Sequence, residues 1–126
     1  MTLPPKNEAP ARALDTELFE ELHESLGNEL DIVAGLYRRF MDNAASSVAA
    51  SLRQSGAERA STLHTLKGSA AMVGAIRIAH LSAHLQESLL EAHSEEAEIA
   101  IRELDGEISR FRAALDSHLK SLGYPK

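Results

Sequence analysis

The sequence contains no cysteine and no tryptophan, and only 4% of its 126 residues are aromatic. Without cysteine there are no disulfides, no thiolate chemistry and no thiolate metal ligands. With so few aromatic side chains, a core must be built from Leu, Ile, Val and Ala, which favours packed helices. The lack of disulfides fits a reducing compartment, and we expect a cytoplasmic location.

Clustered positive charge and long apolar runs are also missing. The formal net charge is −6, which argues against a nucleic-acid surface, because such surfaces need concentrated Lys and Arg. No apolar stretch approaches the roughly 20 residues that span a bilayer, and the N-terminus lacks the pattern of a secretion signal. No nucleotide-binding loop and no kinase signature is present, so we expect no use of ATP and no enzyme activity of that kind.

Proline is confined to the two ends of the chain, at Pro4, Pro5, Pro10 and Pro125. Because proline interrupts helices, we expect residues 1–14 to form a flexible tail or linker and residues 123–126 to form a C-terminal end. The helical domain is expected to span residues 15–122. The tail favours a linker from a larger protein, such as a hybrid sensor kinase, over a free-standing chain.

Between these ends, apolar residues recur every three or four positions, the period of amphipathic helices. Five helices are predicted. The first is short and starts at Asp15 or Thr16. The third begins at a capping box formed by Ser55 and Glu58. The others are expected at about residues 28–52, 75–93 and 94–122. The predicted fold is all-α, an antiparallel up-down four-helix bundle with an additional short N-terminal helix.

His64 is the unusual residue of the third predicted helix. At about 100° per residue, Leu66, Ala70 and Val73 fall near the side of the helix opposite His64, so the histidine is expected to face solvent. The side chains expected around it are all small, and Gly68 costs roughly 1 kcal/mol relative to Ala in a helix interior. A bare face of this kind suits the approach of another protein. The small residues are Ala60, Ser61, Gly68, Ala71 and Ala75.

The residues around His64 also suggest a chemistry. A neutral imidazole is a competent nucleophile near neutral pH, and Lys67, on the flank, can balance the charge of a bound phosphoryl group. If the third and fourth helices are antiparallel neighbours, the side-chain carbonyl of Gln86 can accept from the second ring nitrogen and fix the tautomer.

The stretch His64-Thr65-Leu66-Lys67-Gly68-Ser69-Ala70, followed by Gly74, Leu81, Leu85 and Gln86, resembles the histidine-containing phosphotransfer (HPt) domain over about residues 15–122. The resemblance implies that His64 accepts a phosphoryl group on Nε2 from a receiver-domain aspartate and passes it to another. It implies phosphate contact for Lys67, steric access for Gly68 and imidazole orientation for Gln86. Leu63 departs from the alanine common before the histidine in the family.

The same resemblance implies the partners. They are response-regulator receiver domains, one of them expected to belong to a hybrid sensor histidine kinase, and the chain itself is expected to be a monomer. No cofactor of its own is expected, because the receiver supplies the Mg²⁺. The expected docking surface comprises Ala60, Ser61, Gly68, Ala71, Met72, Ala75 and Ile76, with Val73 as a further rim candidate.

Three other interpretations remain open. A non-catalytic helical adaptor would bind a receiver or another partner through the same face, and an unrelated bundle would be favoured if His64 were buried. A metal site is the third, since His80 and His84 are spaced for one Zn²⁺ and Glu20 with His23 forms one Glu-x-x-His motif. No third ligand is obvious for the histidine pair, and the second Glu-x-x-His motif that a di-iron bundle needs is missing, so we expect no metal site.

Overall fold

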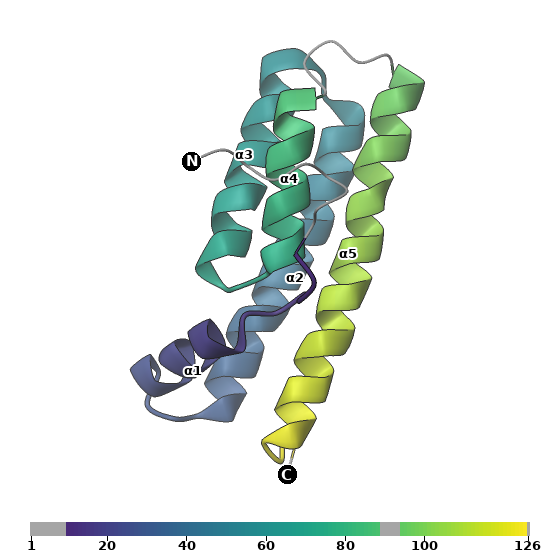
Figure 1. The fold of residues 1–126 in the computed structure, drawn as a ribbon. Coiled ribbons are helices and arrows are strands. Elements are labelled where there is room, and N and C mark those ends of the chain that lie inside the picture. Colours follow the sequence, from purple (N-terminus) through teal and green to yellow (C-terminus); the bar gives the residue numbers. More distant parts are fainter. Residues whose placement is uncertain (1–9, 89–93, 126) are drawn as a thin grey trace.

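The computed structural model describes residues 10–88 and 94–125, which form five helices and no strand (Figure 1). The prediction of an all-α helical bundle with a short N-terminal helix is confirmed. The fourth predicted helix was expected to reach His93, and residues 89–93 lie outside the described part of the chain. The helices are α1 (Thr16–Ser25), α2 (Leu30–Arg53), α3 (Gly56–Met72), α4 (Ile76–Ser88) and α5 (Ser94–Ser121).

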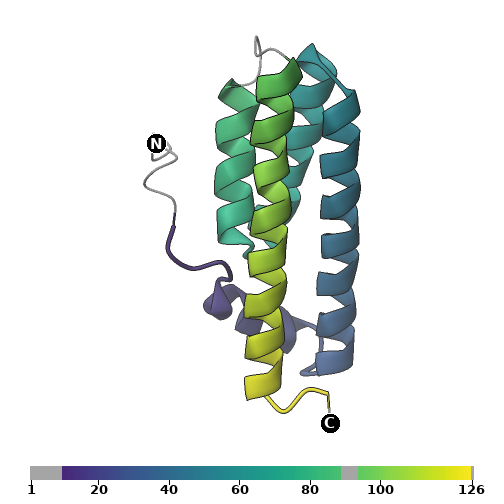
Figure 2. The same cartoon turned by 90° about the vertical axis from the view of Figure 1, so that its right-hand side faces the viewer.

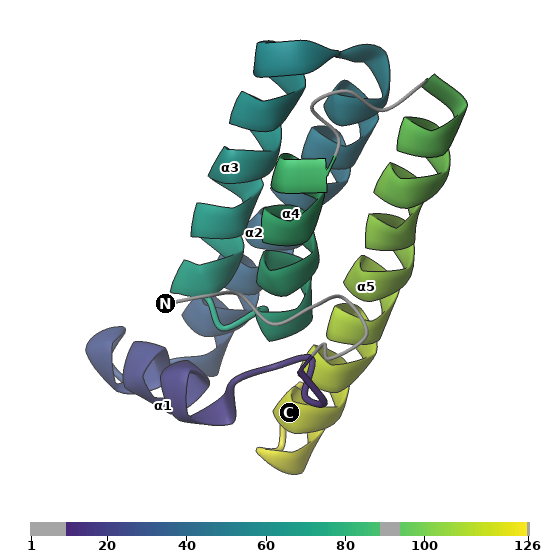
Figure 3. The same cartoon turned by 45° about the horizontal axis from the view of Figure 1, so that its top comes forward.

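The four longer helices form a closed ring of neighbours. Contacts join α2 to α3, α3 to α4, α4 to α5 and α5 back to α2, which is the order of an up-down bundle. Both α2 and α5 run well past the shorter pair α3 and α4 (Figure 2). The short helix α1 lies across the extended part of α2 (Figures 1 and 3). It therefore covers the end of the bundle that α3 and α4 leave open.

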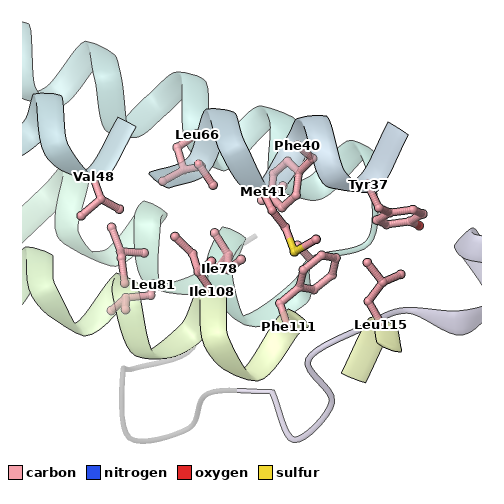
Figure 4. Packing of buried hydrophobic residues seen from close by; sticks show 14 of the residues in the cluster. Tyr37, Phe40, Met41, Val48, Leu66, Ile78, Leu81, Ile108, Phe111 and Leu115 are labelled. Carbon is pink, nitrogen blue, oxygen red and sulfur yellow. The ribbon is translucent and has the colours of Figure 1, made fainter. Parts of the chain in front are cut away.

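The few aromatic side chains of the chain gather where α1, α2 and α5 meet. The ring centroids of Phe40 and Phe111 lie 5.6 Å apart, with the rings edge to face, and the ring centroids of Tyr37 and Phe111 lie 5.9 Å apart. Figure 4 shows these three side chains. Phe19 of α1 stacks on Tyr37 at 5.5 Å. Aliphatic residues such as Leu66, which is 2% exposed, fill the rest of the core. The predicted aliphatic core is thus completed by one aromatic layer.

Two predicted helix starts can be compared with the structure. Asp15 caps α1, and its carboxylate accepts a hydrogen bond from the Leu18 amide at 3.1 Å. Ser55 directly precedes α3, but its side chain makes no capping hydrogen bond, so the predicted capping box with Glu58 is wrong. Gly56, the first residue of α3, has a φ of +55°. This left-handed residue turns the chain at the point where a capping side chain would have to reach the helix amides.

The end of the expected tail is bound to the bundle. Leu14 is 3% exposed, the Ile76 amide donates to the carbonyl of Ala13 at 3.2 Å, and Arg77 Nη1 donates to the carbonyl of Pro10 at 2.6 Å. Residues 10–14 therefore belong to the folded unit rather than to a flexible tail. Residues 1–9 lie outside the described part. The prediction missed these contacts because prolines mark an absence of helix, not an absence of packing.

Glu107 of α5 holds Arg77 in place with two hydrogen bonds, of 2.8 and 2.9 Å, and it also pairs with Arg110 at 3.1 Å. Burial alone would raise the pKa of the Glu107 carboxyl. The hydrogen bonds and charges of Arg77 and Arg110 outweigh burial and hold that pKa below its ordinary value. A carboxyl with a lowered folded-state pKa adds stability above its unfolded pKa and loses it as the pH falls through the folded value.

We therefore expect Glu107→Gln to lower the free energy of unfolding by about 1–2 kcal/mol at neutral pH. The difference from wild type should shrink as the pH falls well below the ordinary Glu pKa of about 4.3, because the wild-type carboxyl becomes protonated as well. Urea unfolding followed by circular dichroism across this pH range measures the difference. The matched control is Glu98→Gln, which removes the exposed pair with Arg102 and should have little effect. A Glu107→Gln deficit that is the same at every pH would contradict the role of this pair.

Candidate functional site

His64 lies in the middle of α3 and is exposed to solvent. The opposite side of the helix is in the core, where Leu63, Leu66 and Ala70 are 1%, 2% and 0% exposed. The helical period thus placed the histidine correctly. An unrelated bundle that buries this ring is excluded.

No other histidine of the described residues 10–88 and 94–125 is exposed. His23, His84 and His118 are half-buried, and His80 is buried. His64 is therefore the most accessible imidazole among the described residues.

The surface beside His64 is bare, as expected. Ser61, Gly68 and Ala71 are exposed, and Ala60 is half-buried. A Cβ atom built on Gly68 would meet no atom within 4 Å, so this glycine is not needed for packing against a neighbouring helix. Its absent side chain instead leaves open space one turn beyond the imidazole.

Ala75 corrects the predicted surface, because it is 0% exposed and forms an isolated bridge with Leu14. The prediction extended the helical period of α3 beyond its real end. In the structure α3 ends at Met72, and Gly74, with a φ of +75°, turns the chain inward. Met72 is 75% exposed at the last turn of α3, and Ile76 is half-buried at the start of α4.

The sharp turn after α3 is fixed from two sides. The Tyr37 hydroxyl of α2 donates a hydrogen bond of 2.8 Å to the carbonyl of Val73. Burial, together with the charge of Asp15, raises the pKa of Tyr37, so the hydroxyl remains a donor. A Cβ atom at Gly74 would lie only 3.0 Å from Cβ of Asp15. The C-terminal end of the histidine-bearing helix is therefore held rigidly.

Lys67 and Gln86 are both half-buried, on α3 and α4 respectively. The two helices are antiparallel neighbours joined at Gly74. His64 lies ten residues before this glycine and Gln86 twelve residues after it, which corresponds to roughly 15 and 18 Å along the helix pair. The two side chains therefore lie at similar heights. Among the described residues neither Lys67 nor Gln86 makes a hydrogen bond or ion pair, so both polar groups are available to a ligand.

A groove between α2 and α3 adjoins this surface, with a volume of about 300 Å³. Leu36, Phe40 and Leu66 contribute to its apolar lining, and Arg39, Ser69 and Met72 line it as well. Of the groove residues, only Met72 and the rim candidate Val73 were predicted from the sequence to belong to the docking surface. A helical wheel describes one helix at a time, whereas a groove depends on how two helices are rotated against each other.

The described residues contain no group of three or more His, Cys, Asp and Glu side chains arranged to hold a metal ion. The Glu20 carboxylate lies 3.8 Å from His23 Nδ1 and 3.7 Å from His118 Nε2.

Within residues 10–88 and 94–125, no helix has the length and apolar character needed to cross a membrane.

Comparisons with known proteins gave one match. The sequence model of the family described as "Hpt domain" matches residues 7–116. No curated protein and no solved structure matches the chain. The matched range starts before the bound segment at residues 10–14 and ends within α5, so it includes His64, Lys67, Gly68 and Gln86.

Proposed function

The chain belongs to the Hpt domain family, and from this membership we propose that it carries a phosphoryl group on His64 between the aspartates of two receiver domains. Hpt domains are phosphocarriers of two-component signalling rather than kinases, and they interact with response-regulator receiver domains. The observation that carries the assignment to His64 is its exposure, which no other histidine in residues 10–88 and 94–125 shares.

The proposed step is an in-line transfer from an aspartyl phosphate. The neutral Nε2 of His64 attacks phosphorus, the N–P bond forms, and the P–O bond to the aspartate breaks and releases the carboxylate. The second ring nitrogen keeps its proton throughout. Reversal of the same step on another receiver regenerates the free histidine, and the Mg²⁺ used in both steps comes with the receiver.

The neighbouring polar residues have supporting roles in this proposal. The ammonium of Lys67 balances the charge of the phosphoryl group as it arrives. Gln86, at a similar height on α4, accepts from the Nδ1–H of the imidazole and favours the tautomer with a free Nε2. The open space at Gly68 admits the receiver's active-site loops.

The docking surface combines the bare face of α3 with the adjoining groove. Small residues near His64 allow close approach, and the apolar groove supplies contact area that water leaves on binding. One of the receivers is proposed to belong to a hybrid sensor histidine kinase and to act as the donor.

The direct test uses purified receiver domains charged with radiolabelled phosphate and mixed with the chain. We expect label to move to the chain as phosphohistidine, which is labile in acid and stable in base. Digestion and mass spectrometry should locate the label in the peptide that contains His64. Failure of every receiver to transfer label would refute the proposed function.

Replacing Lys67 with Ala is expected to slow transfer roughly tenfold, because one charge-assisted contact to the phosphoryl group is lost. Rapid-quench measurement of single-turnover transfer from a charged receiver gives this rate. Transfer should not stop, since the nucleophile remains. The control is Lys120→Ala, which removes an exposed lysine from the far end of α5. Equal rates for the two variants would show that Lys67 has no charge role.

A further inference from the structure

We propose that Arg39 selects among receiver domains by pairing with a carboxylate on the receiver helix that enters the groove between α2 and α3. This inference rests on the proposed function, because it names a contact made by the same partner. Three observations support it. The groove lies next to the face that carries His64, Arg39 has no partner among the described residues, and the rest of the groove has a largely apolar lining.

The groove lies on the flank of the helix that carries the proposed phosphorylation site. On an ideal helix, Gly68 lies about 40° from His64, Met72 about 80° and Ser69 about 140° in the same direction. The bare face therefore runs from the imidazole over Gly68 to Met72, which lines the groove. A protein that reaches His64 over Gly68 meets the groove on the same side of α3.

Arg39 is exposed, and among the described residues that line the groove it is the only charged one. Within residues 10–88 and 94–125 it makes no ion pair or hydrogen bond. Acidic residues outnumber Lys and Arg by 19 to 13, and the arginines Arg12, Arg77, Arg102 and Arg110 all pair with carboxylates. Among the described residues the guanidinium at the groove therefore has no counter-charge, although the sequence is rich in carboxylates.

A partner seated in the groove would remove water from this guanidinium. An arginine that loses water without gaining a counter-charge weakens binding, whereas a carboxylate opposite it supports binding. Receivers that place an acidic side chain there are favoured, and receivers that place Lys or Arg there are rejected. The charge of Arg39 therefore discriminates between partners that share the same apolar fit.

The position of the groove between two packed helices favours a helix as the occupant. Two adjacent helices leave an elongated depression into which a ridge of side chains from a third helix packs. The apolar lining around Phe40 suits the buried face of an amphipathic helix. Met72, 75% exposed, supplies a flexible apolar contact at the rim.

The test compares charge reversal at two adjacent arginines of α2. Arg39→Glu changes the groove, whereas Arg38→Glu makes the same charge change on the α5 side, where Arg38 lines a cavity with Met41 and Leu115. Every receiver domain that loads the wild-type chain serves as a probe. We expect Arg39→Glu to lower kcat/KM for transfer about tenfold at low salt and less at high salt. Arg38→Glu should stay within about twofold of wild type, and the transfer rate at saturating receiver should be unchanged in both variants.

A second arm tests the carboxylate. In the fastest receiver, each exposed Asp or Glu on a helix is changed to Lys and assayed with Arg39→Glu. One position should restore transfer to the variant while slowing transfer to wild type. Equal effects of the two arginine variants, or no restoring position, would overturn the inference and leave the proposed function standing. If no receiver loads the wild-type chain at all, both are wrong.

Discussion

Replacing His64 with Gln is expected to abolish phosphoryl uptake from every receiver while leaving the bundle folded. The loss should reach about 10³-fold or more, because no other group takes over a missing nucleophile. The imidazole is exposed, so its replacement opens no cavity and breaks no core contact. Label transfer from a charged receiver measures the activity, and circular dichroism with thermal unfolding measures the fold.

His84→Gln provides the matched control on the neighbouring helix. This residue is half-buried and has no place in the proposed chemistry, so its variant should take up label as wild type does. Labelling of His64→Gln at the wild-type rate would show that the acceptor lies elsewhere. A His64→Gln variant that binds receivers with unchanged affinity but takes up no label would also separate docking from chemistry.

Of the variants considered, Phe111→Ala should lower the free energy of unfolding most, by about 3–5 kcal/mol. Phe111 is 0% exposed and its ring contacts those of Tyr37 and Phe40. Truncation removes a large apolar area from the core and leaves a cavity that long, rigid helices close poorly. Urea unfolding at constant pH gives the difference in unfolding free energy.

The control for this variant is Ile99→Ala on the same helix. Ile99 is 70% exposed, and its truncation should change stability by less than about 0.5 kcal/mol. If Phe111→Ala lowered the free energy of unfolding by less than about 1 kcal/mol, the aromatic layer between α2 and α5 would not contribute strongly to the stability of the core. Folded Phe111→Ala protein should still accept a phosphoryl group, since Phe111 is buried and has no place in the proposed chemistry.

The sequence was sufficient to predict the helices and the orientation of His64. Both depend on a local period, because residues on one face of a helix are set by spacing along a single segment. Glycine at the end of a helix is a local signal of the same kind: Gly27 and Gly74 follow the ends of α1 and α3 with φ values of +81° and +75°. In each case the deciding information lies within a few residues.

Apart from the capping box at Ser55, which is local to α3, the errors concern features that two segments share. Ala75 is buried because the turn at Gly74 brings it against Leu14, a contact between residues that are far apart in the sequence. The binding of residues 10–14 depends on Arg77, which is itself held by Glu107. The groove that contains Arg39 exists only when α2 and α3 are packed together. Periodicity within one helix carries no information about such pairings.

The use of His64 by both receivers, as proposed, also sets the order of events. In the proposed relay, donor and acceptor both use the exposed imidazole of His64, so the two cannot be bound to it together, and the donor must leave before the acceptor binds. At an association rate constant of about 10⁶ M⁻¹s⁻¹, a Kd of about 1 µM gives a complex lifetime of about 1 s, and a Kd of about 1 nM gives about 1,000 s. Tight binding therefore slows such a relay, and transfer is fastest when the complexes with both receivers are short-lived.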